Sequence, residues 1–243
     1  MTVPGILEMS GETERRTQML SLVLAAIFFA GIHLGVAGTT WRDRAVAALG
    51  EGVFRAAFSI ASLVGIIWLV MAYKHAPYVA TWGVPVWWKP IAIMLMLPAF
   101  LLAVIGLTTS NPTIVGEEGR VARPPEGIVR VTRHPFLIGV GLWAVVHLIA
   151  NGDLASFIFF GSLAVTALAG TVSIDAKRRR ALGHAWQSFA AQTSIVPFGA
   201  IAARRTRLKP DEIAAWQWVA AIITYVLFLG GHSYIFGVSP FPG

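Results

Sequence analysis

Residues 135–174 read PFLIGVGLWAVVHLIANGDLASFIFFGSLAVTALAGTVSI, and Asp153 is the only Asp, Glu, Lys or Arg among them. It separates two runs, 135–152 and 154–174, each long enough to cross a hydrocarbon core about 30 Å thick as a helix. The sequence Asn-Gly-Asp at 151–153 is a tight-turn signal. A segment in lipid must satisfy its backbone polar groups internally, so the stretch predicts two transmembrane helices joined as an antiparallel hairpin.

Other stretches without Asp, Glu, Lys or Arg extend this pattern to the whole chain. They are residues 17–41, 56–73, 90–116 and 213–243. Hydrophobic residues make up 56% of the chain and charged residues 13%, about half the charged share of soluble domains. We therefore predict an all-α, polytopic transmembrane bundle of about six spans that forms a single integral membrane domain, residues 1–243.

The basic residues predict an orientation for these spans. Fifteen of the 19 Lys and Arg residues lie in the first, third and fifth connections. The positive-inside rule then places these connections in the cytoplasm and both termini outside, as in a protein of the bacterial inner membrane. The net charge of +7 is accordingly interpreted as charge facing membrane lipid, and no nucleic-acid partner is expected.

The fifth connection, about residues 175–211, is amphipathic. Leu182, Trp186 and Phe189 recur at helical spacing beside the basic run 177–180. This pattern is typical of a helix lying on the lipid surface, or of a connector helix packed on the bundle.

Two histidines, His33 and His147, fall deep inside predicted spans, and His232 lies near the outer end of the last span. A buried ionisable residue in a membrane is costly and is a functional candidate, although a neutral histidine can also serve as a hydrogen-bonding group between helices. Helix bundles build cofactor sites from facing side chains, and imidazole is a common axial ligand of haem iron. At 1.5 Å per residue, His33 lies about 12 Å from the cytoplasmic end of its span and His147 about 18 Å from that of its own, so a shared iron requires tilt or a later end to the first span.

The start of the fourth span carries a second group of candidates. Arg130, Arg133 and His134 lie within the five residues before Pro135. Helix N-termini attract anions, so a phosphate, a haem propionate or a lipid headgroup could bind there, with Arg133 and His134 as cofactor contacts. Ordinary interfacial arginines before an N-terminal proline are the alternative.

Several of these motifs together resemble the NnrU family, which includes 15-cis-zeta-carotene isomerase. The motifs are Thr-Arg-His-Pro at 132–135, Leu-Trp-Ala-Val-Val-His-Leu at 142–148, Ala-Asn-Gly-Asp at 150–153, Trp-Arg-Asp at 41–43, Leu-Gly-Glu-Gly at 49–52, Phe-Arg at 54–55, Lys-Arg-Arg at 177–179, Gly183, and Thr-Ser-Ile-Val-Pro-Phe at 193–198. The resemblance covers most of the chain.

The resemblance implies an integral membrane protein that binds haem b. His33 and His147 fall at the family's ligand positions, and His134 matches a further family histidine. The implied reaction turns a central cis double bond of a carotenoid-like polyene to trans, on reduced iron, with a hydrophobic substrate from the bilayer and an electron donor of unknown identity. The plant enzyme has a cysteine close before the second histidine, whereas residues 143–146 here read Trp-Ala-Val-Val.

Other functions remain open at the level of sequence. The NnrU branch proper is linked with nitrite and nitric oxide reduction, where a haem sensor or assembly factor would use the same histidines. Isoprenylcysteine and phospholipid methyltransferases, which use S-adenosylmethionine, also carry Arg-His-Pro at a helix start. The stretch from Asp175 to Pro197 echoes their tail, but it lacks their glutamate pair and has Trp186 where they have tyrosine.

Overall fold

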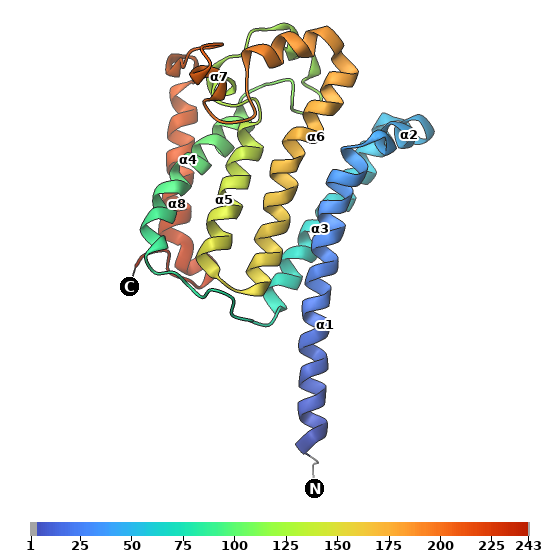
Figure 1. Ribbon diagram of the computed structural model, residues 1–243, viewed down its shortest axis with the longest axis vertical. Coiled ribbons are helices and arrows are strands. Elements are labelled where there is room, and N and C mark those ends of the chain that lie inside the picture. Colours follow the sequence, from blue (N-terminus) through green and yellow to red (C-terminus); the bar gives the residue numbers. More distant parts are fainter. Residues whose placement is uncertain (1–3, 243) are drawn as a thin grey trace. The chain divides into compact units, whose positions relative to one another are not determined.

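The computed structural model describes residues 4–242, with side chains from residue 11 onward. The described elements are all helices: α1 (Pro4–Gly31) continued by the π-helix η1 (Ile32–Ala37), α2 (Thr40–Leu49), α3 (Glu51–His75), α4 (Trp88–Thr108), the 3-10 turns η2 (Glu118–Ala122) and η3 (Gly127–Arg130), α5 (Pro135–Asn151), α6 (Leu154–Gln192), α7 (Gly199–Ala202), η4 (Pro210–Glu212) and α8 (Ala215–Phe236). Figure 1 shows them in chain order by colour. The prediction of an all-α protein is confirmed.

Five helices are long and apolar enough to cross a membrane. They are α1 with η1, α3, α4, α6 and α8, and the shorter apolar α5 has 17 residues, the lower end of the spanning range. Each predicted span therefore corresponds to one helix, in the predicted order. This set of helices fits a multi-pass membrane protein.

The chain forms two compact units, and the first contains residues up to 85 together with 147–166. In it α1 and α3 pack side by side, with η1 and α2 joining them at one end (Figure 1). An ionic cluster closes this end, because Glu51 accepts from Arg42 at 2.6 Å and from Arg55 at 2.8 Å. Further along the pair, the indole of Trp68 donates to Ser21.

The turn predicted between the fourth and fifth spans is present in the first unit. Helix α5 ends at Asn151, α6 begins at Leu154, and Gly152 has a φ of +60°. A Cβ at Gly152 would lie 1.8 Å from the carbonyl oxygen of Gly83, so no other residue fits. The Gly152 carbonyl in turn accepts from the backbone N–H groups of Thr81 and Gly83.

The second unit contains residues 86–146 and 167–243, and small residues bring its helices close together. A Cβ on Gly139 of α5 would lie 2.7 Å from both the carbonyl oxygen of Ala99 and the backbone nitrogen of Ala103 in α4. On the other side α4 contacts α8, where Gln217 donates to the Thr108 hydroxyl at 2.9 Å. Such close backbone approach is a usual means of helix association in membranes, where burial of apolar surface gives little driving force.

We expect Gly139→Ala to destabilise the protein by about 2 kcal/mol or more, because the added methyl meets backbone rather than a mobile side chain. The melting temperature of the purified protein in detergent measures the effect. Gly230→Ala in α8 is the control, since Gly230 is exposed and a Cβ there meets nothing within 4 Å. Equal melting temperatures for the two variants would contradict the close α4–α5 contact.

Two helix ends differ from the predicted spans. Helix α4 stops at Thr108, eight residues before the end of the charge-free stretch, because Asn111 and Pro112 follow and the residue before a proline is disfavoured in a helix. Helix α6 continues past residue 174 through its basic run and bends at Gly183, which has φ 53° and ψ −125°. The charge-free stretches therefore predicted the positions of the apolar helices better than they predicted where each helix ends.

The amphipathic segment of the fifth connection is the C-terminal part of α6. Trp186 and Phe189 are 1% and 3% exposed and belong to a core cluster with Val129, Val131 and Ile213. The interpretation of this segment as a helix lying on lipid is therefore wrong, and the alternative of a packed connector is correct. The apolar face of this segment packs against residues 128–131 of the same chain.

Candidate functional site

His33 lies in the π-helical segment η1, at the end of the first apolar helix. Single π-helical turns are rare and occur frequently at functional sites. Gly31 and Gly35 lie on either side of His33 in the sequence, and a Cβ on either would meet no atom within 4 Å. The helix surface next to His33 is therefore open to a bulky or planar neighbour.

The imidazole of His33 is held by the chain's own backbone. Its Nδ1 lies 2.7 Å from the carbonyl oxygen of Phe29, and its ring contacts Phe29 and Phe58 at centroid distances of 4.4 and 5.3 Å. Because a carbonyl can only accept, Nδ1 is the donor, and Nε2 is the nitrogen left to face a ligand. Metal-binding histidines commonly have this arrangement, with one nitrogen donating to a carbonyl and the other facing the metal.

His147 lies near the C-terminal end of α5, in the same unit as His33. Its ring stacks on Phe160 of α6, with centroids 5.2 Å apart and planes 27° apart. The side-chain amide of Asn151, one turn later, donates to the His147 carbonyl at 2.7 Å. Both predicted ligands therefore belong to one compact unit, and both contact phenylalanine rings.

The other two predicted residues, Arg133 and His134, meet at a carboxylate in the second unit. The His134 Nε2 lies 2.7 Å from Oδ1 of Asp175, and the Arg133 Nε lies 2.9 Å from its Oδ2. The side chains of His134, Asp175 and Arg133 are 1%, 7% and 11% exposed. We call these three residues the Asp175 cluster; it joins the segment before α5 to α6.

One nitrogen of this cluster has no partner. The Nδ1 atom of His134 is buried and makes no hydrogen bond among the described residues. Burial lowers the pKa of His134, and this effect outweighs the opposite effect of Asp175. The imidazole is therefore neutral at neutral pH, donates from Nε2 to Asp175, and keeps a lone pair on Nδ1.

Sequence reasoning did not identify the carboxylates that hold these arginines. In the sequence Asp175 marks one end of the amphipathic connection and of the methyltransferase-like stretch, and nothing along the chain indicates a partner for Arg178. Arg178 is 3% exposed and donates to Glu118 at 2.5 Å and to the Ile114 carbonyl at 2.8 Å. The sequence held one signal that Asp175 is special. It is the only acidic residue between Asp153 and Asp211, and a basic run follows it.

Arg130 is also bound within the chain. Its guanidinium makes two hydrogen bonds to Glu212, at 2.6 and 2.8 Å, and Glu212 also accepts from the Gly127 N–H. Such bidentate pairs are among the stronger ion pairs in proteins. The sequence suggested that Arg130 and Arg133 bind an anion at the helix start. In the structure the guanidinium groups of both arginines pair with carboxylates of the protein.

We expect the Arg130–Glu212 pair to make stability depend on pH in acid. The hydrogen bond from Arg130 is the main cause that lowers the pKa of Glu212 from 4.5 to about 2. The pair thus stabilises the fold fully above pH 4.5, and this contribution is lost as pH falls towards 2. Melting temperatures between these pH values should fall less for Glu212→Gln than for the wild type, and Asp211→Asn is the control. An unchanged slope in Glu212→Gln would contradict the assignment.

Comparison with known proteins places the chain in a family. The model of the NnrU family, described as NnrU protein, matches residues 21–240. The chain is 25% identical over 222 residues to 15-cis-zeta-carotene isomerase, chloroplastic, of Zea mays, which covers 87% of this chain and 58% of the relative. It is 26% identical over 214 residues to the protein of the same name from Arabidopsis thaliana, which covers 86% of this chain and 56% of the relative.

No solved structure matches the chain. The chain spans less than two thirds of the length of either plant relative. The family match extends over nearly all of the described residues and includes His33, Arg133, His134 and His147. The protein therefore belongs to the NnrU family.

Proposed function

We propose that the protein is a membrane-embedded cis–trans isomerase of a carotenoid-like polyene, with haem b held by His33 and His147. The observation that carries this proposal is the similarity to two isomerases over 86% and 87% of the chain, together with a family match that includes both histidines. The fold supports it, because both histidines lie on apolar helices, as expected of residues that serve a substrate dissolved in lipid.

The surroundings of His33 support its role as an iron ligand. The Phe29 carbonyl accepts from Nδ1, so Nε2 is the nitrogen that would bind iron. The open surface beside Gly31 and Gly35 leaves room for a planar macrocycle or an extended polyene. The rings of Phe29 and Phe58 pack against the imidazole and help to hold its orientation.

The outer surface of the first unit suits a substrate that arrives from the bilayer. Large apolar side chains of α1 and α3 are exposed along this surface, including Ile27 at 63% and Ile60 at 64%. A polyene is as apolar as a lipid tail, so it gains little binding free energy when it exchanges lipid for these side chains. It can therefore move along this surface without being held there. We therefore assign the recognition of the substrate to the residues around His33.

The reaction is a rotation about one double bond, and no atom is gained or lost. Haem b bound at the two histidines would supply an iron that exchanges electron density with the polyene and lowers the order of the bond that rotates. The protein's residues hold and orient: His33 is fixed by the Phe29 carbonyl, and His147 is stacked on Phe160.

The experiment is done on the full chain purified in detergent. Its absorption spectrum should contain a Soret band and, after reduction with dithionite under anaerobic conditions, a sharp alpha band. Incubation with a linear polyene that has a central cis double bond should yield the trans isomer by chromatography. Protein without reductant and heat-denatured protein are the controls.

Each outcome bears on a separate part of the proposal. Colourless protein that isomerises the polyene would contradict the haem assignment. Haem-loaded, reduced protein that leaves the polyene unchanged would contradict the isomerase and favour a haem sensor. Conversion that depends on reduction supports both parts.

We infer in addition that the arginine-rich connections face the cytoplasm. The chain has no cysteine, so single cysteines can be introduced and labelled in intact cells with a membrane-impermeant maleimide. Arg179→Cys should stay unlabelled until the cells are opened, and Lys74→Cys should be labelled from outside. The reverse pattern would invert the assigned orientation.

A further inference from the structure

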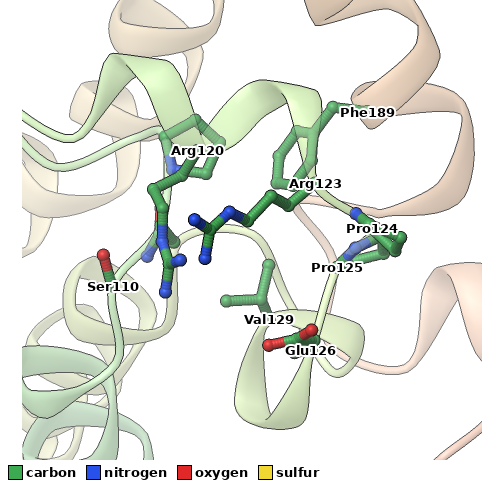
Figure 2. A pocket seen from close by; sticks show the side chains of 10 residues that line it. Ser110, Arg120, Arg123, Pro124, Pro125, Glu126, Val129 and Phe189 are labelled. Carbon is green, nitrogen blue, oxygen red and sulfur yellow. The ribbon is translucent and has the colours of Figure 1, made fainter.

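A recess in the second unit contains two arginines (Figure 2). It encloses about 280 Å³, part of it open to solvent. Residues just after α4, the connection before α5, and one residue of α6 form its lining: Ser110, Asn111, Pro112, Arg120, Arg123, Pro124, Pro125, Glu126, Val129 and Phe189. Figure 2 shows the guanidinium groups of Arg120 and Arg123 pointing into it from the same connection.

These two arginines differ from the buried arginines of the same unit. Arg130, Arg133 and Arg178 each donate at short distance to a carboxylate. The guanidinium of Arg123 has no hydrogen bond or ion pair within residues 11–242, and that of Arg120 has only a 3.9 Å contact with Glu117. Two cations that line one recess repel each other, so a negatively charged ligand between them would relieve this repulsion.

A buried amide adds a third donor. Asn111 is 2% exposed, and its Oδ1 accepts from the backbone N–H of Thr113 at 2.8 Å and from the Thr113 hydroxyl. The amide orientation is thereby fixed, and its Nδ2 donates to no other group in the described part of the chain. Because Asn111 lines the recess, this N–H group can donate to a ligand oxygen there.

The remaining lining restricts the ligand. Phe189, Val129 and two prolines form apolar walls, so part of the ligand can be apolar. Glu126 places one carboxylate in the same recess, which disfavours a polyanion and accepts hydrogen bonds from a hydroxyl or an amine. This combination suits a singly charged phosphodiester that bears a polar group.

The recess also lies close in sequence to the ends of two apolar helices, where lipid headgroups are expected. Ser110 follows the end of α4 by two residues, and Val129 precedes Pro135 of α5 by six. Basic residues immediately outside membrane-spanning helices are the usual contacts of phospholipid headgroups.

We propose that this recess binds the phosphate group of a phospholipid headgroup through Arg120, Arg123 and Asn111. The site is separate from the histidines of the first unit and does not rest on the isomerase assignment. It places anion binding before the helix start at Pro135, on two arginines that make no short hydrogen bond to a carboxylate.

The test uses the full chain, purified and stripped of lipid in detergent. Three probes are titrated while the melting temperature is followed: short-chain phosphatidylglycerol, inorganic phosphate, and the matching diacylglycerol without phosphate. A ligand that binds only the folded state raises the melting temperature in proportion to its saturation. Phosphatidylglycerol is expected to raise it, and diacylglycerol is not.

Two variants and one control locate the binding. The double variant Arg120→Gln, Arg123→Gln should weaken the apparent affinity at least about tenfold, because two charge-assisted hydrogen bonds are removed. Asn111→Asp keeps the acceptor for Thr113 but replaces the donor by a negative charge, and should weaken it similarly. The control, Arg179→Gln with Arg180→Gln, removes the same charge from exposed positions of α6 and should bind as the wild type does.

The outcomes separate the sources of phosphate. Stabilisation by phosphatidylglycerol alone, lost in both recess variants, supports the headgroup. Equal stabilisation by inorganic phosphate overturns the lipid as source and leaves a site for free phosphate. Equal stabilisation by diacylglycerol, or equal loss in the Arg179, Arg180 control, overturns the proposal.

Discussion

Purified His33→Ala and His147→Ala proteins are expected to lose the Soret band and the isomerisation of a cis polyene. Replacing even a residue that only supports a metal ligand commonly lowers metal affinity about 10- to 100-fold, so loss of the ligand itself should reduce bound haem at least as much. Absorbance at the Soret maximum per protein, measured at equal protein concentration, gives the haem content. Chromatography of the polyene gives the activity.

The chain offers a matched control for His33. His75 has the same local geometry, with its Nδ1 2.7 Å from the carbonyl oxygen of Met71 four residues earlier, but it is exposed at the end of α3. His75→Ala should retain full pigment. Free imidazole added to His33→Ala should restore part of the Soret band, which distinguishes a lost ligand from a lost fold. Unchanged pigment in both His33→Ala and His147→Ala would remove the basis for haem held by these histidines.

The largest loss of stability is expected at the Asp175 cluster. Asp175→Ala leaves Arg133 and His134 buried without their shared carboxylate, and breaking a buried ion pair by removing one partner costs about 3 to 5 kcal/mol. Unfolding of the purified protein in detergent, followed by circular dichroism, measures the change. Asp211→Ala, an exposed acid in the same unit, is expected to change stability little.

A double-mutant cycle separates coupling from general damage. Arg133→Gln should destabilise the wild type more than it destabilises Asp175→Ala, because its partner is already absent in the second background. Additive losses would show that Arg133 and Asp175 do not stabilise the fold through each other. Asp175→Asn, which keeps the shape and can still accept from His134, should fall between Asp175→Ala and the wild type.

Much of the fold was predictable because a lipid environment imposes simple rules. A helix that crosses about 30 Å of hydrocarbon excludes charge over a length that can be counted, so the spans containing His33 and His147 were identified from composition. The turn at Gly152 was predictable for a local reason, since Asn-Gly-Asp favours a positive φ. Helix ends were less accessible: α6 continues beyond residue 174 because charged residues do not terminate a helix outside lipid.

The partners of the charged residues could not be obtained in this way. Arg123, Arg130 and Arg133 are alike in the sequence, yet Arg130 pairs with Glu212, Arg133 pairs with Asp175, and Arg123 reaches an open recess. Likewise, the periodicity of Trp186 and Phe189 showed an apolar face but not what covers it. The ion pairs and the apolar contacts join residues about 40 to 80 positions apart in the sequence, and local propensity does not determine which distant groups meet.

The sequence by itself determined that the chain is a set of apolar helices, in which order they occur, and which histidines lie within them. Periodicity, charge exclusion and turn chemistry are properties of neighbouring residues and can be read along the chain. Only the tertiary structure decided which arginines are neutralised and which remain available to a ligand. That outcome depends on long-range contacts such as Arg133 with Asp175, whose geometry arises when the helices pack.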